Sequence, residues 1–367
     1  MIVVPAERIT HMSRSYLKAL SLGLAALACL LASHAFAEPI QWVTVGDPRN
    51  TADNTTYGDV LTSFQIMKYE FTNQQYTEFL NSVDASGTNP NSVYNTNMGS
   101  DVRGGITNTG TTNGSRYAVK TNMGDKPVNF VSWFDAARVS NWYQNGATSS
   151  SSTETGAYTL TSGTSGNAPA VNSGATFYIP TEDQWYKAAF YKGGSTTAGY
   201  WDYATQSDTA PTAVTAGTTG IGSAGSAGNF ANYLDDANWN DRSGNVTTVG
   251  TNGVSSAYGA FDMNGNITEW NDLTGLVAGS TRGVRGGFWG SFSESSLQSS
   301  FNQAIAPSDE SDVYGFRLAS PVVVPEPSTW VMAAGGLACA GWGAWRRHAR
   351  RSRLPLRMLR SRSEGAI

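Results

Sequence analysis

Cysteine and histidine occur only near the two ends of the chain, and none lies within residues 38–320. The five residues concerned are Cys29, Cys339, His11, His34 and His348. The central part can therefore form no disulfide and no zinc site built on thiolate or imidazole. It also lacks the side chains of a cysteine nucleophile or a Ser-His-Asp triad. Any metal bound there must rely on oxygen ligands, and any fold must hold without covalent cross-links.

The first 37 residues predict a cleaved export signal. A basic stretch at residues 8–18 precedes the apolar run Ala19–Leu31, and residues 35–37 read Ala-Phe-Ala, a small-residue cleavage pattern. We therefore expect the mature chain to begin at Glu38. A retained membrane anchor is the alternative.

The other end combines a linker, an apolar run and a basic tail. Residues 321–328 contain Pro-Glu-Pro, Thr329–Trp345 is mostly apolar, and 346–367 is rich in arginine. The run has the length of a short transmembrane helix, and the arginines favour a cytoplasmic tail. This order resembles the PEP-CTERM sorting signal of Gram-negative bacteria, which implies handling by an exosortase. The expected location is the cell surface, outer membrane or exopolysaccharide matrix; a plain tail anchor is the alternative.

The central part is strongly acidic. Residues 38–320 hold 25 of the 28 Asp and Glu residues but only 13 of the 24 Lys and Arg residues, a net charge of −12 that the overall −4 conceals. Such a charge argues against binding to nucleic acid. It is compatible with calcium and with a hydrated extracellular matrix.

Three capping boxes predict helix starts at Thr72, Ser132 and Thr181, because each is followed three residues later by Gln or Asp and then by apolar side chains at helical spacing. The predicted strands cover residues 42–45, 64–69 and 176–179. Long polar connections rich in Gly, Ser, Thr and Asn cover 84–126, 146–175 and 205–228. Their composition predicts mobile or functional loops, and we interpret 146–175 as a surface insertion.

Asn264-Gly265 is a strong turn signal, and two carboxylates, Asp262 and Glu269, lie on either side of it. Hard oxygen ligands around a tight glycine turn suit calcium better than a transition metal. The alternative is that Asp262 forms the turn and Glu269 is a solvated charge.

Five segments in fixed order resemble the formylglycine-generating enzyme (sulfatase-modifying factor) family. They are YEFTNQQYTEFLN at 69–81, FYIPTEDQWYKAAFYKGG at 177–194, YGAFDMNGNITEW at 258–270, RGVRGGFW at 282–289 and YGFRLAS at 314–320. The resemblance spans residues 42–320. It implies one α+β domain with the loop-rich, C-type lectin-like fold of that family.

Enzymes of this family bind copper(I) through two cysteines that follow the glycines of the RGG segment. Counted without gaps from Gly286-Gly287, those positions hold Ser291 and Ser296. A hydroxyl is too hard a ligand for copper(I) and cannot form a mixed disulfide with a substrate. We therefore expect neither copper nor formylglycine-generating oxidase activity.

The resemblance also implies two structural calcium sites, which would tie loops together in a domain without disulfides. The first would use the side chains of Asp262 and Glu269 with the carbonyls of Gly265 and Ile267. The second would use the side chains of Asn232 and Asp241 with the carbonyls of Tyr233 and Ser243, although Asp235 and Asp236 compete for the acidic position.

A ligand groove is expected at the family's active site. Its candidate lining residues are Trp270, Arg285, Phe288, Trp289 and Arg317, together with Ser291 and Ser296. Aromatic rings, guanidinium groups and hydroxyls can bind sugars or extended peptides. The alternative is that Trp270 and Trp289 belong to the core and Arg317 to an ion pair.

Three functions remain open at this point. We favour an exported, non-catalytic module that binds polysaccharide or protein at the cell surface. The second is an enzyme with oxidoreductase or carboxylate chemistry at Asp262, Glu269 or Glu294, which as a glycosidase would need two carboxyl groups about 5–10 Å apart in an open cleft. The third is a purely structural matrix protein, which would bind no ligand at any calcium concentration.

Overall fold

All three capping boxes begin a helix in the computed structural model, which describes residues 39–161 and 163–322. The helices are α2 (Asn73–Val83), α4 (Trp133–Gln144) and α5 (Glu182–Phe190). In each, the N-cap hydroxyl accepts the backbone N–H of the third helical residue, whose side chain accepts the N-cap N–H. The helix starts are therefore confirmed at Thr72, Ser132 and Thr181.

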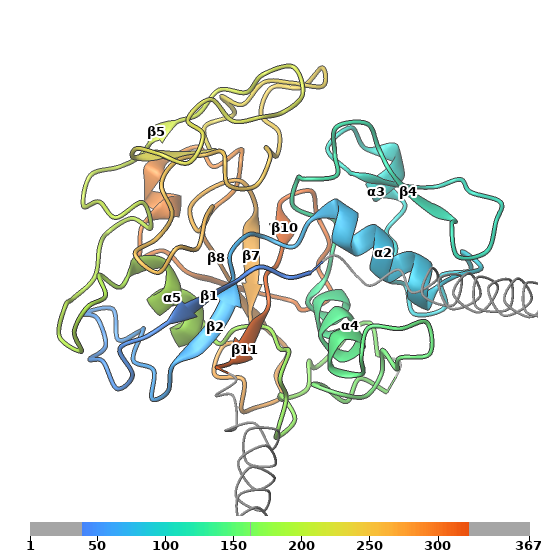
Figure 1. The fold of residues 1–367 in the computed structure, drawn as a ribbon, viewed down its shortest axis with the longest axis horizontal. Coiled ribbons are helices and arrows are strands. Elements are labelled where there is room, and N and C mark those ends of the chain that lie inside the picture. Colours follow the sequence, from blue (N-terminus) through green and yellow to red (C-terminus); the bar gives the residue numbers. More distant parts are fainter. Residues whose placement is uncertain (1–38, 162, 323–367) are drawn as a thin grey trace, which may run out of the picture. The chain divides into compact units, whose positions relative to one another are not determined.

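Two small sheets lie at the centre of the described structure (Figure 1). The first is antiparallel, with the order β1 (Trp42–Val45), β2 (Phe64–Met67), β11 (Ala319–Pro321). The second has the order β10 (Tyr314–Gly315), β7 (Thr268–Asn271), β8 (Arg282–Arg285), β9 (Gln303–Ile305). Because β10 and β11 belong to different sheets, residues 314–321 join the two sheets.

The predicted strand at 176–179 is wrong. Tyr178 makes only an isolated bridge to Ala319, with hydrogen bonds of 3.0 and 2.7 Å between their backbones. Pro180 follows and has no N–H to donate, and the cap of α5 begins at Thr181. The strand predicted over 64–69 forms but ends at Met67.

Two clusters of buried side chains hold the fold together. The larger packs α2 and α4 against Trp270 and Phe316, and the other packs α5 against β1 and β2. In Figure 1, α5 accordingly lies beside β1 and β2, while α2 and α4 lie on the other side of β7 and β10. The aromatic stripes of the three helices are core, as their spacing predicts.

The polar connection 84–126 contains more structure than its composition predicts. It forms the short helix α3 (Asn97–Ser100) and a hairpin of β3 (Ile106–Asn108) and β4 (Tyr117–Val119). Buried apolar residues, among them Tyr94 and Tyr117 with ring centroids 5.1 Å apart, anchor it to the core. A few apolar residues are enough to order a long polar segment when each one is buried.

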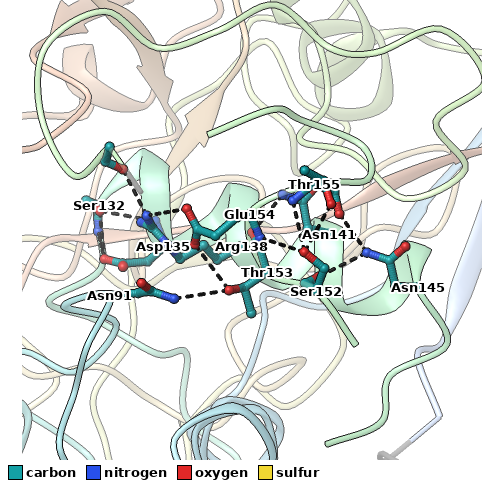
Figure 2. A network of polar contacts seen from close by, with 11 residues as sticks. Asn91, Ser132, Asp135, Arg138, Asn141, Asn145, Ser152, Thr153, Glu154 and Thr155 are labelled. Carbon is teal, nitrogen blue, oxygen red and sulfur yellow. Dashed lines mark hydrogen bonds and ion pairs between the residues drawn. The ribbon is translucent and has the colours of Figure 1, made fainter. Parts of the chain in front are cut away.

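The predicted insertion at 146–175 is tied to α4 by side-chain hydrogen bonds (Figure 2). Asn141 donates to the Thr153 carbonyl at 2.7 Å and accepts the Tyr158 N–H at 2.8 Å. Arg138 pairs with Glu154 at 2.8 Å. Figure 2 shows the contacts of Asn141 with Thr153 and of Arg138 with Glu154 running along α4. Polar bonds therefore help to fix a segment in which the composition provides few apolar anchors.

The loops between α5 and β7 carry little regular structure, only β5 (Thr212–Ala213) and β6 (Phe230–Ala231). They lie around the upper part of Figure 1, near the 3-10 helix η1 (Glu294–Leu297). Within residues 39–322, no helix is long and apolar enough to cross a membrane. The predicted signal peptide, the linker beyond Val322, the apolar run and the basic tail lie outside the described residues.

Candidate functional site

The two serines at the expected cysteine positions lie on either side of Gly287. A Cβ added to this glycine would stand 3.0 Å from Ser291 Oγ and 3.1 Å from the Ser296 carbonyl. Ser291 is buried, and its hydroxyl accepts the Phe288 N–H at 3.0 Å, which closes a turn. Since the described residues include no histidine, neither serine has an imidazole base that could activate it.

An apolar surface opens directly beside Ser291. Phe292 is 86% exposed, and Leu234 is 39% exposed. The two segments are held together by backbone bonds, from Leu234 N–H to the Ser291 carbonyl at 3.1 Å and from Asp235 N–H to the Trp289 carbonyl at 3.0 Å. Acidic residues neighbour these positions in the sequence, with Asp235 and Asp236 after Leu234 and Glu294 two residues after Phe292. We call this group the Ser291 surface: Leu234, Asp235, Asp236, Phe288, Phe292 and Glu294.

Tyr233 lies beneath the acidic side of this surface. Burial raises the pKa of its hydroxyl, and the carboxylates of Glu294 and Asp236 raise it further. Its hydroxyl donates to the Pro211 carbonyl at 2.5 Å. The two carboxylates therefore both act on the Tyr233 hydroxyl although they come from different loops.

Three of the five predicted groove residues do not line a groove. Trp270 is fully buried and donates its indole N–H to the Val131 carbonyl at 3.0 Å. Arg285 is buried in an ion pair with Glu182 at 2.6 Å, and Arg317 is buried in another. The prediction is wrong for these three because they are buried and the interior binds their polar groups, although Arg285 Nη2 has no hydrogen-bond partner among the described residues.

The other two groove candidates lie nearer the surface. Trp289 is nearly buried, with the Arg103 guanidinium 3.8 Å from its ring centroid. Arg103 in turn donates to the carbonyls of Ser243 and Gly244, both at 3.0 Å. Phe288 is half-buried and packs edge-on against Trp289. Trp289 thus supports the Ser291 surface from below, while Phe288 remains part of it.

Glu269 lies in the interior and is fully engaged. Arg317 contacts both of its carboxylate oxygens at 2.6 Å, and the Trp185 indole N–H adds a bond of 2.8 Å. This is the bidentate geometry in which a guanidinium binds a carboxylate most strongly. Glu269 is therefore neither the solvated charge nor the free calcium ligand that the sequence predicts, because Arg317 balances its charge and would repel a cation.

Asp262 adopts a left-handed backbone conformation, with φ of 56°, just before the predicted turn. Its carboxylate accepts the Gly250 N–H at 2.5 Å and the Asn252 amide at 2.9 Å. Burial raises the pKa of Asp262, and these two bonds oppose that effect. A cavity of about 10 Å³, the size of one water, lies against it.

The turn itself forms as the sequence predicts. Gly265 has φ of 77°, and a Cβ there would stand only 2.3 Å from the Asn232 carbonyl. Asn266 follows, also with positive φ, and its amide bonds to Glu70 and Thr247. Glycine is needed here both for the conformation and for the close approach of the Asn232 backbone.

Glu70 is the buried acid that sequence reasoning missed. One of its oxygens accepts the Asn266 amide at 2.7 Å, and the other, Oε1, has no hydrogen-bond partner among the described residues. Burial raises the pKa of Glu70 well above its usual value, and the charges of Asp262 and Glu269 raise it further. An acid placed between the apolar residues of 66–71 was the available signal.

This buried centre therefore combines three acids, Glu70, Asp262 and Glu269, with one guanidinium, that of Arg317. The excess of negative charge and the bare Glu70 oxygen fit a cation, but Glu269 does not serve as its ligand. Among residues 39–161 and 163–322, no three acidic side chains converge closely enough to hold a metal alone. An ion here would need backbone carbonyls such as those of Gly265 and Ile267.

The second predicted calcium set does not form one site. Asn232 is fully buried, and its amide donates to the Asn245 carbonyl at 2.8 Å, while Asp241 is exposed. The Ser243 carbonyl is occupied by the Arg103 guanidinium. A carbonyl bound to a cationic side chain is a poor calcium ligand. Asn232 Oδ1 is a buried oxygen without a hydrogen-bond partner in the described part of the chain.

Comparison with known proteins gives a family match. The chain matches the family model of the Sulfatase-modifying factor enzyme 1-like domain over residues 43–322. A search of curated proteins gave no match. Three solved structures each match 77% of this chain: CarF (21% identity, 99% of that chain, TM-score 0.47), Treponema denticola variable protein 1 (18%, 95%, 0.44) and PvdO from Pseudomonas aeruginosa (19%, 92%, 0.37).

Proposed function

Because the chain belongs to the sulfatase-modifying factor family but has serine at both expected cysteine positions, we propose that it is an exported binding module without oxidase activity. The carrying observation is the Ser291 surface, where Phe292 is 86% exposed at the place expected for the catalytic pair. Aromatic residues are enriched in the interfaces through which proteins bind their partners. The ligand we favour is a polysaccharide.

The chemistry of this surface supports a sugar polymer. An exposed phenyl ring packs well against the apolar face of a sugar ring, and carboxylates accept hydrogen bonds from its hydroxyls. Asp235 and Asp236, which follow Leu234, and Glu294, two residues after Phe292, would supply such acceptors. Their negative charge would repel an acidic polymer, so the proposed ligand is neutral or basic.

The carboxylate enzyme is less well supported. Asp262 and Glu269 are buried, and both are held by hydrogen bonds or an ion pair. Only Glu294 of the three candidate acids is open to solvent. A glycosidase needs a pair of accessible carboxyl groups, which these three residues do not provide.

We further propose that calcium stabilises the domain through the buried centre. Glu70, Asp262 and the carbonyls of Gly265 and Ile267 would hold the ion, which would offset the excess negative charge beside Arg317. Two observations support this: Glu70 Oε1 has no hydrogen-bond partner among the described residues, and the charges of Asp262 and Glu269 disfavour a negative charge on Glu70. The proposed location is the cell surface or exopolysaccharide matrix, reached through the predicted export and PEP-CTERM signals and the exosortase machinery.

A glycan-array screen of the purified full chain in calcium tests the binding function. We expect Phe292→Ser to weaken binding at least about tenfold, equivalent to about 1.4 kcal/mol. Ile221→Ser is the matched control, because Ile221 is also an exposed large apolar residue, at 53%, but lies in the loops after β5. Equal binding by both variants would reject the Ser291 surface. Binding to no glycan would favour a protein ligand or the purely structural role.

A further inference from the structure

The loop between β7 and β8 presents bare aliphatic side chains to solvent. The connection covers residues 272–281, in which Leu276 is 79% exposed and Val277 is 67% exposed. Asp272 is its only charged residue and pairs with Arg282, while residues 273–281 carry no charge. Soluble surfaces seldom place two adjacent large aliphatic residues at a loop tip, and such tips mark a contact with a partner or a membrane. We call this segment the Leu276 loop.

The Leu276 loop lies beside the point where the chain leaves the domain. Leu276, Thr274 and Pro321 line one groove of about 250 Å³, together with Val171, Ala175 and Tyr178. Figure 1 shows β11 ending at the lower edge of the described structure, at the end opposite β5. The exposed aliphatic residues of the Leu276 loop and Pro321, the last residue of β11, therefore lie at the same end of the domain.

Among the described residues that line this groove, Asp272 is the only charged one. Arg282 pairs with it at 2.7 Å, with both side chains buried. The Tyr158 hydroxyl also donates to Asp272 at 3.1 Å. The described lining of the groove is thus compensated in charge although the domain as a whole is acidic, and exposed apolar side chains beside it can bind a membrane interface through the apolar area that they bury.

The sequence beyond the domain supplies the reason for a membrane as the partner. Only residues 322–328 separate Pro321 from the predicted spanning segment Thr329–Trp345. Seven extended residues reach at most about 25 Å. A chain anchored by that segment would keep Pro321, and the Leu276 loop beside it, within that distance of the bilayer surface.

We propose that the Leu276 loop is a membrane-contacting tip, which inserts Leu276 and Val277 into the bilayer interface when the chain is anchored. The inference rests on the predicted C-terminal membrane segment, before any processing removes it. Two aliphatic side chains bind a bilayer weakly alone, but a short tether raises their effective concentration at its surface. The contact would orient the domain on the membrane, with the loops after β5 directed away from it.

Fluorescence of the full chain reconstituted into phosphatidylcholine vesicles tests this. With Cys29 and Cys339 replaced by serine, Val277→Cys provides a single thiol for an environment-sensitive label. We expect its emission to shift to the blue and to lose most of its intensity when the lipids carry a quencher on their acyl chains. A label at Ile221→Cys should show neither change.

A second comparison isolates the aliphatic side chains. A label at Ala278→Cys should be quenched in the native loop and much less so with Leu276→Ser and Val277→Ser together. A label at position 277 that behaves like the one at 221 overturns the inference. If the chain does not float with the vesicles, the predicted anchor falls as well. Glycan binding by the Ser291 surface is measured without vesicles, so it stands or fails separately.

Discussion

Replacing Glu70 by glutamine tests how the buried centre balances its charge. Glu70 is fully buried, one of its oxygens is bare, and Asp262, Glu269 and Arg317 are the charged groups around it. Glutamine has the same shape, and its carbonyl can still accept the Asn266 amide. The variant therefore removes the charge while it keeps the hydrogen bond of 2.7 Å.

The sign of the pH effect follows from the raised pKa of Glu70. A carboxyl group whose pKa is higher in the folded than in the unfolded state stabilises the fold fully below its unfolded pKa. This stability is lost as the pH rises through the folded pKa. Without calcium, the native domain should lose up to about 1.4 kcal/mol per pH unit across that window from this group alone. Glu70→Gln should not show that loss.

Denaturant unfolding of native protein and Glu70→Gln, from pH 5 to pH 9 in EDTA, measures the difference between the two profiles. We expect the glutamine variant to be the more stable one at high pH. Millimolar calcium should stabilise the native protein at high pH by several degrees in a thermal melt, and the variant much less. Parallel pH profiles in EDTA would refute the charge argument. If calcium does not change the stability of the native protein, a proton on Glu70 would be what neutralises this carboxylate.

Three other perturbations probe separate parts of the structure. Arg317→Met should lower the free energy of unfolding, measured with denaturant, by about 3–5 kcal/mol because it leaves the buried Glu269 carboxylate unpaired. Adding Glu269→Gln should restore part of the loss. If Arg317→Met alone is as stable as the native protein, the buried ion pair is contradicted. Asn141→Ala should speed protease cleavage within 146–175 while it leaves the core intact, and unchanged cleavage would show that other contacts hold the segment. Thr72→Ala should cost about 1 kcal/mol as a lost N-cap, whereas Thr72→Ser should cost much less.

The sequence predicts best where the cause is local. The helix starts at Thr72, Ser132 and Thr181 depend on side chains three residues apart, and the turn at Gly265 depends on a glycine beside asparagine. Both signals are complete within a few residues, so no distant partner can change them. The strand ending at Ile179 fails because its pairing depends on β11, which lies far along the chain.

The candidate site is hard to predict because it depends on long-range partners. Glu269 meets Arg317, which lies 48 residues away, and Glu70 meets Asn266, which lies 196 residues away. Arg285 and Trp270 have the composition of a ligand groove, and only their burial shows that Glu182 and the Val131 carbonyl satisfy them. Phe292 shows the opposite case, because nothing in its sequence distinguishes an exposed phenylalanine from a core one.

The buried centre and the Ser291 surface share no residues, so serine at the expected cysteine positions leaves the contacts of the interior unchanged. The interior is fixed by Glu269–Arg317, by the Asn266 amide and by the aromatic core, none of which needs a thiol. Ser291 still closes its turn by accepting the Phe288 N–H at 3.0 Å. A serine at this position therefore costs the scaffold little, and the loops around it are free to present Phe292 to a ligand. Selection on such a surface would act through exposed residues, and selection on the interior through the charge balance around Arg317.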